Sequence, residues 1–128
     1  MEHPNAVVFR QALEKLMAGE TEALRSLIAD DVVWWQIGSD QPVRGLAALL
    51  AQMQTYEGAE FKLDIHDVLA NDEHTVALVT ATVGAGDQAF SYRTAEIVHI
   101  TDGKITERWA FSDDTAAIND FFAELGAG

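Results

Sequence analysis

Apolar side chains recur with helical spacing in the N-terminal part of the chain. In residues 5–18 they fall at i, i+1, i+4 and i+5, which is typical of one face of an amphipathic helix, and they are Val8, Phe9, Ala12, Leu13, Leu16 and Met17. Gly19 is expected to end this helix. Thr21 is a candidate N-cap for a second, short helix, which Asp30 and Asp31 would end before the first strand.

The pattern then changes to the alternation of strands, in segments rich in β-branched and aromatic residues. Strands are predicted over residues 32–37, 61–70 and 75–83 and in both arms of a hairpin over 88–113. The dipeptide Asp102-Gly103 is typical of the tight turn of such a hairpin. The alternation changes phase after His66, which predicts a bulge near Asp67.

Two further helices complete the predicted elements. One runs from about Leu46 to Gln54, and the last follows a cap at Asp113 or Asp114, with an apolar side made of Ile118, Phe121, Phe122 and Leu125. The order of elements predicts an α+β fold, in which a curved, mostly antiparallel sheet packs against three to four helices. Such a sheet would leave a cone-shaped cavity between the layers. Residues 1–128 are expected to form a single domain.

The charge of the chain limits its expected partners. Its 128 residues hold 21 acidic side chains against 8 Lys and Arg, a formal net charge of −13 at pH 7. Neither nucleic acid nor an anionic membrane is therefore expected, because both attract clustered Lys and Arg. The chain has no cysteine, and its four histidines show no metal-ligand spacing, so no metal and no cofactor are expected. The N-terminus lacks the pattern of a signal peptide, and no apolar stretch reaches the ~18 residues that span a bilayer, which favours a cytoplasmic location.

Glu96 is the sharpest candidate for chemistry. It lies in the first arm of the hairpin, on the alternation face that carries Phe90, Tyr92, Thr94, Val98 and Ile100. If that face lines the cavity, burial would favour the uncharged carboxyl group, which suits a proton donor or a weak base near neutral pH. The alternatives are a position on the outer, wet face or a salt bridge to Arg93 or Arg108.

Other side chains could complete a ligand site beside Glu96. Counting back from the turn pairs residue 97 with Arg108, which could then reach Glu96 diagonally. Such a pair could hold a carboxylate or an enolate, or it could be a surface salt bridge. Gln36 shares a strand face with Trp34 and could orient a carbonyl or a water, unless it only ends the strand. Aromatic residues are expected mainly in the core, and those proposed to line the cavity are Trp34, Phe61, Tyr92 and Trp109.

Several short motifs follow one another in a recognisable order. They are Ala18-Gly19 at the end of the first helix, LIADDVVWW at 27–35, PVRG at 42–45 and DGKITERW at 102–109, followed by an aromatic C-terminal helix. In this order they resemble the NTF2-like superfamily (cystatin-like fold), which includes ketosteroid isomerases, SnoaL-like polyketide cyclases and limonene epoxide hydrolase. The resemblance covers nearly the whole chain. It implies a cone-shaped apolar pocket and, often, a homodimer formed across the outer sheet face.

The resemblance also carries family residues onto this chain, position by position. In the ketosteroid isomerase pattern, the base aspartate falls on Gln36, the oxyanion-hole tyrosine near Ala12 and the second oxyanion donor on Glu96. Of these three positions, only Glu96 keeps a suitable group. The cyclase motif EHWD reads ERWA here, so Arg108 replaces its histidine and Ala110 its acid. One carboxylate of the Asp-Arg-Asp set of the epoxide hydrolase also falls near Ala110.

Three functions follow from these patterns. The favoured one is the binding of a small apolar molecule in a cone-shaped pocket, because the family's bases are replaced. The second is an isomerase or cyclase in which Glu96 donates or accepts a proton, while Gln36 orients the substrate and Trp34 and Tyr92 pack against it. The third is a dimerisation domain whose cavity is filled by side chains. The identity of the ligand and the presence of catalysis stay open.

Overall fold

The helices and strands follow the predicted order, with one short strand added. The computed structural model describes residues 2–54, 61–84, 87 and 89–127, without the side chains of 61, 122 and 124–127. The predicted hairpin start at Gln88 and the side chains of Phe61, Phe122 and Leu125 lie outside this description. The elements are α1 (Pro4–Met17), η1 (Thr21–Ser26), β1 (Ile28–Trp34), β2 (Val43–Arg44), α2 (Leu46–Gln54), β3 (Phe61–Ala70), β4 (Thr75–Val83), β5 (Phe90–Thr101), β6 (Lys104–Ser112) and α3 (Thr115–Ala127).

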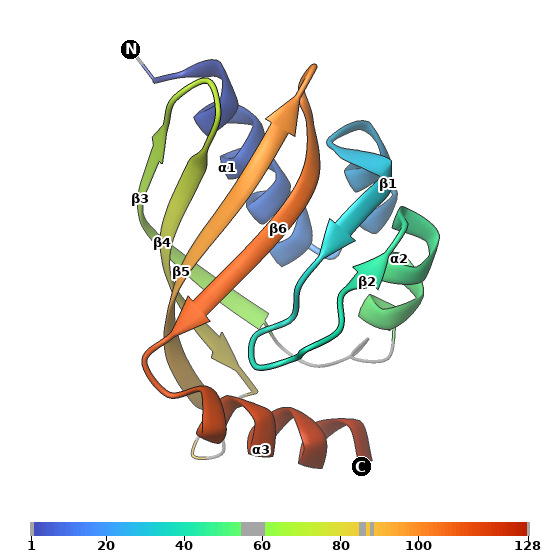
Figure 1. Cartoon of the computed structure of the whole chain (residues 1–128). Coiled ribbons are helices and arrows are strands. Elements are labelled where there is room, and N and C mark those ends of the chain that lie inside the picture. Colours follow the sequence, from blue (N-terminus) through green and yellow to red (C-terminus); the bar gives the residue numbers. More distant parts are fainter. Residues whose placement is uncertain (1, 55–60, 85–86, 88, 128) are drawn as a thin grey trace.

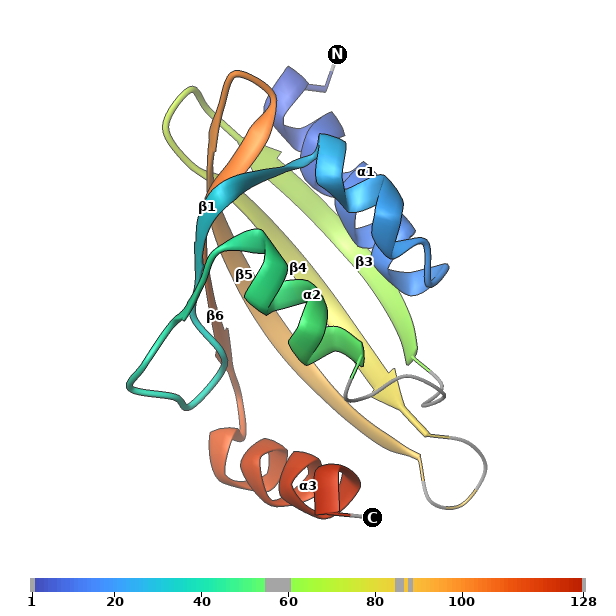
Figure 2. The ribbon, with the colours of Figure 1, turned by 90° about the vertical axis from the view of Figure 1, so that its right-hand side faces the viewer.

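The strands form one six-stranded sheet in the order β2-β1-β6-β5-β4-β3. β1 runs parallel to β6, and all other neighbours are antiparallel. The sheet curves around α1 and α2, which cover its inner face, while α3 lies across one end of the sheet (Figure 1 and Figure 2). The predicted α+β fold, with a curved and mostly antiparallel sheet against helices, is confirmed.

The core lies between the inner face of the sheet and α1. Phe9 and Leu13 of α1 are almost fully buried there, and burying one such side chain stabilises the fold by about 1.5–3 kcal/mol. Alternate residues of the central strands point into the same layer. In β4 and β5 these buried residues are Thr75, Ala77, Val79, Ala81, Val83, Thr94, Glu96, Val98 and Ile100. A charged side chain therefore lies within a layer that is otherwise mostly apolar.

β1 begins and ends earlier than predicted. It covers Ile28–Trp34 rather than 32–37. Parallel pairing explains its start, because its first residue lies opposite Ile105 of β6. The last backbone hydrogen bond to β6 comes just after β1, from the N–H of Trp35 to the carbonyl oxygen of Arg108, at 2.8 Å. Beyond this bond the chain leaves the sheet.

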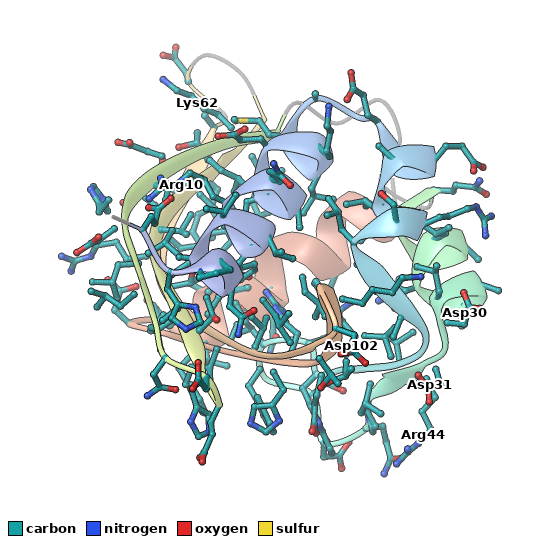
Figure 3. All side chains as sticks on the ribbon, turned by 90° about the horizontal axis from the view of Figure 1, so that it is seen from above. Arg10, Asp30, Asp31, Arg44, Lys62 and Asp102 are labelled. Carbon is teal, nitrogen blue, oxygen red and sulfur yellow. The ribbon has the colours of Figure 1, made fainter. Side chains whose placement is uncertain are left out.

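Asp30 and Asp31 lie inside β1, so the prediction that they end the second helix is wrong. Both are exposed, and they stand with Arg44 at the edge of the molecule, away from the core (Figure 3). The register of β1 against β6 shifts between Ile28 and Val33. This irregular stretch lets both carboxylates reach water, whereas regular alternation would turn one of them inwards.

Two short elements differ from what the apolar pattern predicts. The second helix is a 3-10 helix that ends at Ser26, before the two inward apolar residues Leu27 and Ile28. β2 is not predicted at all, because two residues are too few to show alternation. Its two residues pair with the end of β1, as Val33 opposite Arg44 and Trp34 opposite Val43.

The β5–β6 hairpin turns at Asp102 and Gly103, as predicted. These residues have φ angles of +52° and +78°, and positive φ at both central positions is the requirement of a type I′ turn. The ladder starts with Thr101 opposite Lys104. The local sequence alone therefore identifies the turn.

One extra residue in β6 sets the register of the rest of the hairpin. Ile100 lies opposite Ile105, but His99 lies opposite Glu107. Thr106 thus has no partner across the ladder, which is the arrangement of a β-bulge. Its hydroxyl donates to the carbonyl oxygen of His99 at 3.3 Å. Because strand side chains alternate, a shift of one residue exchanges the two faces of β6 beyond this point.

The bulge reverses the sides on which Arg108 and Trp109 lie. A regular ladder counted from the turn pairs Arg108 with residue 97, on the outer face. In the structure Arg108 lies opposite Val98 on the inner face, and Trp109 lies opposite Ile97 on the outer face. The predicted pairing of 97 with 108 is therefore wrong by one residue.

Two local predictions are confirmed at other elements. The register of β3 against β4 shifts between Ile65 and Asp67, at the predicted bulge. Of the two candidate caps of α3, Asp114 is the one that binds, because its Oδ1 accepts the backbone N–H of Ala117 at 3.0 Å. Both features follow from local sequence signals, a change of phase and a capping residue.

Candidate functional site

The inner face of the sheet holds a buried ion pair between Glu96 and Arg108. The Nε and Nη2 atoms of Arg108 donate to Oε1 of Glu96 at 3.2 Å and 3.0 Å. The two side chains are only 9% (Glu96) and 11% (Arg108) exposed. A cross-strand diagonal brings them together, because Glu96 lies opposite Ala110 and Arg108 two residues before it.

The last residue of β1 and the residue after it hold the guanidinium of Arg108 in place. The Nη1 atom donates to the backbone carbonyl of Trp35 at 2.9 Å. The ring of Trp34 lies against the same group, with Cζ of Arg108 4.8 Å from the ring centroid, a cation–π contact. Both contacts exist because β1 runs beside β6 with Trp34 opposite Arg108. Arg108 is thereby held from β1 and β5 at once.

Thr94 and Tyr92 extend the polar site along β5. The hydroxyl of Thr94 donates to Oε2 of Glu96 at 3.4 Å. Burial, together with the negative charge of Glu96, raises the pKa of Tyr92 to about 12, although the positive charge of Arg108 acts in the opposite direction. The Tyr92 hydroxyl is therefore neutral at physiological pH and can serve as a hydrogen-bond donor.

Glu96 is not surrounded by apolar side chains alone, because its carboxyl group contacts the guanidinium of Arg108. An adjacent cation favours the carboxylate form, whereas burial favours the acid. Of the two arginines predicted as partners, Arg108 makes the contact. Arg93 instead binds Asp113, with Nη2 to Oδ2 at 3.0 Å, where both side chains are well exposed. The inner pair is thus distinct from this surface salt bridge.

The other predicted site residues are Trp109, Gln36 and Phe61. Trp109 is on the outer face, edge-on to His99 with ring centroids 4.9 Å apart. Gln36 is half-buried but follows the end of β1, so it does not share a strand face with Trp34. Phe61 begins β3 opposite Val83, and its side chain lies outside the described part of the chain.

Sequence reasoning did not assign a role to Thr94 or to the carbonyl group of Trp35. Thr94 could have been found, because it precedes Glu96 by two residues and therefore shares its strand face. The Trp35 carbonyl has no signal in the sequence, since any residue there offers the same backbone acceptor. Only the pairing of β1 with β6 places it beside Arg108.

Two hollows lie near the site, one on each side of the sheet. The inner one has a volume of about 10 Å³, close to the space of one water molecule. It is lined by apolar side chains, among them Trp34, Phe9 and Met53. The outer one is open and much larger, about 320 Å³, and its lining includes Arg93, Phe111 and Asp113. The ion pair belongs to the inner side.

Two features are absent from the described part of the chain, a cluster of metal-ligating side chains and a helix that could span a membrane. No group of three or more His, Asp or Glu residues there is arranged to hold a metal ion. No helix of residues 2–54, 61–84 and 89–127 is long and apolar enough to cross a membrane.

The chain belongs to the SnoaL-like domain family, whose model matches residues 9–108. This range runs from Phe9 within α1 to Arg108 within β6 and includes both residues of the ion pair. No curated protein has a matching sequence.

Solved structures share the fold at low sequence identity. An LEH-like epoxide hydrolase from M. tuberculosis has a TM-score of 0.78 and 19% identity, covering 98% of this chain and 91% of its own. IdmH from Streptomyces antibioticus, provisionally assigned as a polyketide cyclase, has a TM-score of 0.76 and 21% identity, with 97% and 99% covered. A provisionally assigned ketosteroid isomerase from Kribbella flavida has a TM-score of 0.72 and 20% identity, with 85% and 77% covered. The predicted NTF2-like fold is thus confirmed.

Proposed function

We propose that this protein binds a small, mainly apolar molecule against the inner face of its sheet, next to the Glu96–Arg108 pair. The buried pair is the observation that carries the proposal. Replacing such a pair with apolar residues is often neutral or even stabilising, so stability alone is a weak reason for its presence. A polar group within an apolar layer suits the recognition of a ligand that is itself mostly apolar.

Each site residue has a role in this proposal. Glu96 and Arg108 supply the polar contact, Trp34 packs beside them, and Tyr92 offers a neutral hydroxyl further along β5. Phe61 and Gln36 remain predicted contacts at the ends of β3 and β1. Trp109 is not part of the proposed site, because it lies on the outer face. The similar structures support a ligand of this kind, since their names refer to an epoxide, a polyketide and a ketosteroid.

Native mass spectrometry of the purified protein tests the binding proposal. We expect a bound small molecule that is released on unfolding, and we expect the variant Trp34→Ala to lose it. Trp109→Ala is the matched control, because it removes the same side chain from the other face of the sheet. If the wild-type protein carries no small molecule and gains thermal stability from none in a library of apolar compounds, the proposal is wrong.

A second candidate function is proton transfer of the isomerase or cyclase type, with Glu96 as the base. It is favoured by the position of Tyr92, which lies on the same face of β5 as Glu96 and four residues before it. A substrate of several atoms would reach both groups. Glu96 would take a proton from the carbon next to a carbonyl, and the electron pair of that C–H bond would form an enolate whose oxygen accepts a hydrogen bond from Tyr92.

Exchange of ketone protons for deuterium tests this second function without knowledge of the substrate. The probe is 2-tetralone in D2O, followed by NMR. Wild-type protein should speed the exchange above the buffer rate, Glu96→Gln should remove the effect, and Tyr92→Phe should reduce it by roughly 10- to 100-fold. Exchange that stays at the buffer rate with wild-type protein would exclude the enzyme and leave the binding proposal standing.

We also propose a homodimer formed through the outer face of the sheet. This face carries three large apolar side chains that water reaches freely, which are Phe111 at 62% exposed, Leu69 at 55% and Leu78 at 41%. Ala95 lies between Leu78 and Phe111 across the ladder, and Ile97 and Trp109 lie in the next row; all three are half-buried. A continuous apolar face of this kind is typical of a contact between proteins. In a chain with a net charge of −13, it is also a place where two copies meet with little charge repulsion.

A further inference from the structure

One end of the outer face carries a cluster of aromatic and titratable side chains around His99. Trp109 of β6 lies edge-on to this imidazole, and His74, which directly precedes β4, lies beside it; both ring centroids are 4.9 Å from that of His99. The Nδ1 atom of His99 is 3.9 Å from Oε1 of Glu107. At this distance the two groups can form an ion pair, although a hydrogen bond would be shorter.

Trp35 holds the carboxylate of Glu107 next to His99. Its indole Nε1 donates to Oε2 of Glu107 at 3.3 Å, which leaves Oε1 towards the imidazole. An indole N–H carries no charge, so this bond does not balance the charge of the carboxylate. Among the described residues, the charged or titratable groups that face His99 from the strands beside it are Glu107, Lys104 and His74.

The cluster borders the apolar part of the outer face that is proposed to form the homodimer. Ile97 and Trp109 pair across β5 and β6 in the row next to His99 and Glu107. The three exposed apolar side chains of this face are too few for an interface, because a stable one takes about 800 Å² and 20–30 residues from each partner. An interface of that size extends to the row of His99 and Glu107.

The charge of this row changes between about pH 5 and pH 8, where histidine titrates. In the described part of the chain, Glu107 has no ion pair other than that with His99. With a neutral imidazole, each copy therefore brings an unmatched carboxylate to the interface. Two such carboxylates repel each other and lose water, and both effects oppose association.

With a protonated imidazole, each copy brings a neutral ion pair to the interface instead. The side chains of His99 and Glu107 are 39% and 31% exposed in the single chain, so a second copy would cover them further and strengthen their attraction. His74 does not double the effect, because two imidazoles whose centroids are 4.9 Å apart resist being charged together.

We propose that His99 and Glu107 make the homodimer pH-dependent, so that two copies associate more tightly when His99 is protonated. The inference rests on the proposed homodimer and specifies its regulation. Protonation and association favour each other, because the coupling between two binding events is reciprocal. The dimer therefore takes up protons as it forms, and a fall in pH drives its formation.

Sedimentation equilibrium of the full chain at pH 8 and at pH 6 measures the association constant. The buffers contain about 0.5 M NaCl, which screens the general repulsion between chains of net charge −13. For wild-type protein we expect association to be at least about fivefold tighter at pH 6, the lower end of typical coupling between two sites.

Two variants test whether this pair causes the pH dependence. His99→Gln removes the titrating group, so the association constant should be nearly equal at the two pH values. In Glu107→Gln the protonated imidazole becomes the unmatched charge, so association should weaken as the pH falls. Circular dichroism at both pH values checks that each variant is folded.

The control is His3→Asn, which removes a histidine from the start of α1, on the helix that covers the inner face. Asparagine can also cap a helix, so the fold should be kept. Because this variant leaves the outer face unchanged, it should keep the pH dependence of wild type.

The outcomes distinguish this inference from the homodimer on which it rests. If wild-type protein dimerises equally well at both pH values, or if His99→Gln responds to pH as wild type does, the regulation by this pair is wrong and the homodimer stands. If Glu107→Gln still associates more tightly at pH 6, the regulation is equally wrong. If wild-type protein is monomeric at both pH values and at every concentration, the homodimer and its regulation are both wrong.

Discussion

At the scale of single residues, Glu96 and Arg108 are each held in the core by the other. Their side chains are almost sealed from water, and a lone buried charge is far less stable than a paired one. The backbone of Trp35 and the ring of Trp34 add contacts to Arg108 only. Replacing one member of the pair is therefore expected to lower the free energy of unfolding more than replacing both.

The first prediction concerns the stability of the pair. Arg108→Met should lower the free energy of unfolding at pH 7 by about 3–5 kcal/mol, because it leaves the Glu96 carboxylate buried without a partner. Glu96→Leu/Arg108→Met should lie within about 1–2 kcal/mol of wild type. Urea unfolding measures both.

The control for this prediction is Arg93→Met, which removes an arginine from the exposed pair with Asp113. An exposed pair contributes at most about 1 kcal/mol, so this variant should stay close to wild type. If Arg108→Met and Arg93→Met lower the free energy of unfolding equally, the buried pair is no more important for stability than the exposed one.

The second prediction concerns the titration of Tyr92. Because its pKa is raised to about 12, Tyr92 stays protonated in the folded protein at pH values where the unfolded chain, with a tyrosine pKa of about 10, has lost the proton. Its contribution to stability is complete below pH 10 and is lost as the pH rises towards 12, a change of about 2–3 kcal/mol.

Tyrosinate absorbance against pH, with circular dichroism to follow folding, measures this titration. The absorbance that disappears in Tyr92→Phe should rise near pH 12 or at alkaline unfolding, whichever comes first. A Tyr92 signal centred near pH 10 in folded protein would mean that the hydroxyl is not buried beside Glu96.

At the scale of elements, the loop after β1 depends on close contact with α3. Gly38 has a φ of +78°, and a Cβ atom there would lie 2.6 Å from Nδ2 of Asn119 and 2.8 Å from Cγ2 of Thr115. The same contact fixes how the segment after Trp34 leaves the sheet. Gly103 in the hairpin turn has the same φ of +78° but open space around it, which makes it a matched comparison.

The third prediction compares alanine at these two glycines. Gly103→Ala should lower the free energy of unfolding by about 1–2 kcal/mol, because the left-handed backbone is strained with a side chain. Gly38→Ala should cost a further 1–3 kcal/mol or so, because it also overpacks against α3. Chemical unfolding measures the difference. Equal losses would show that the loop does not press on α3; a smaller loss for Gly38→Ala combined with Asn119→Gly would support the contact.

The hairpin shows how far element-scale reasoning reaches. The Asp102-Gly103 turn and the inward face of Glu96 both follow from local patterns, a turn dipeptide and alternation by two. The bulge at Thr106 does not, because one extra residue in a strand leaves no clear mark on a short pattern. This bulge places Arg108 on the inner face with Glu96 and Trp109 on the outer face. The site therefore lacks Trp109, which the sequence predicted as one of its residues.

At the scale of the whole molecule, the apolar outer face of the sheet and the net negative charge have opposite effects on association between copies of the chain. The net charge of −13 opposes contact between copies over most of the surface. Phe111, which is 62% exposed, lines the open hollow with Arg93 and Asp113. It is therefore the side chain where loss of an apolar contact should matter most.

The fourth prediction is that Phe111→Asp weakens the proposed homodimer by at least about tenfold, since it places a further acid on the apolar face. Sedimentation equilibrium over a range of protein concentrations gives the association constant. Val7→Asp is the control, because Val7 is also an exposed apolar residue but lies on α1. A wild-type protein that is monomeric at every concentration, or equal weakening by both variants, would contradict a dimer through this face.

The sequence by itself determined the kinds and order of the main elements, the hairpin turn, the cap of α3 and the buried side of β5. These features depend on interactions between residues close together in the chain, so the local pattern contains their cause. Tertiary structure decided where β1 begins and ends, how β6 is registered against β5, and hence which arginine meets Glu96. Those outcomes depend on pairing between distant strands, where a displacement of one residue exchanges the two faces and changes the chemistry inside.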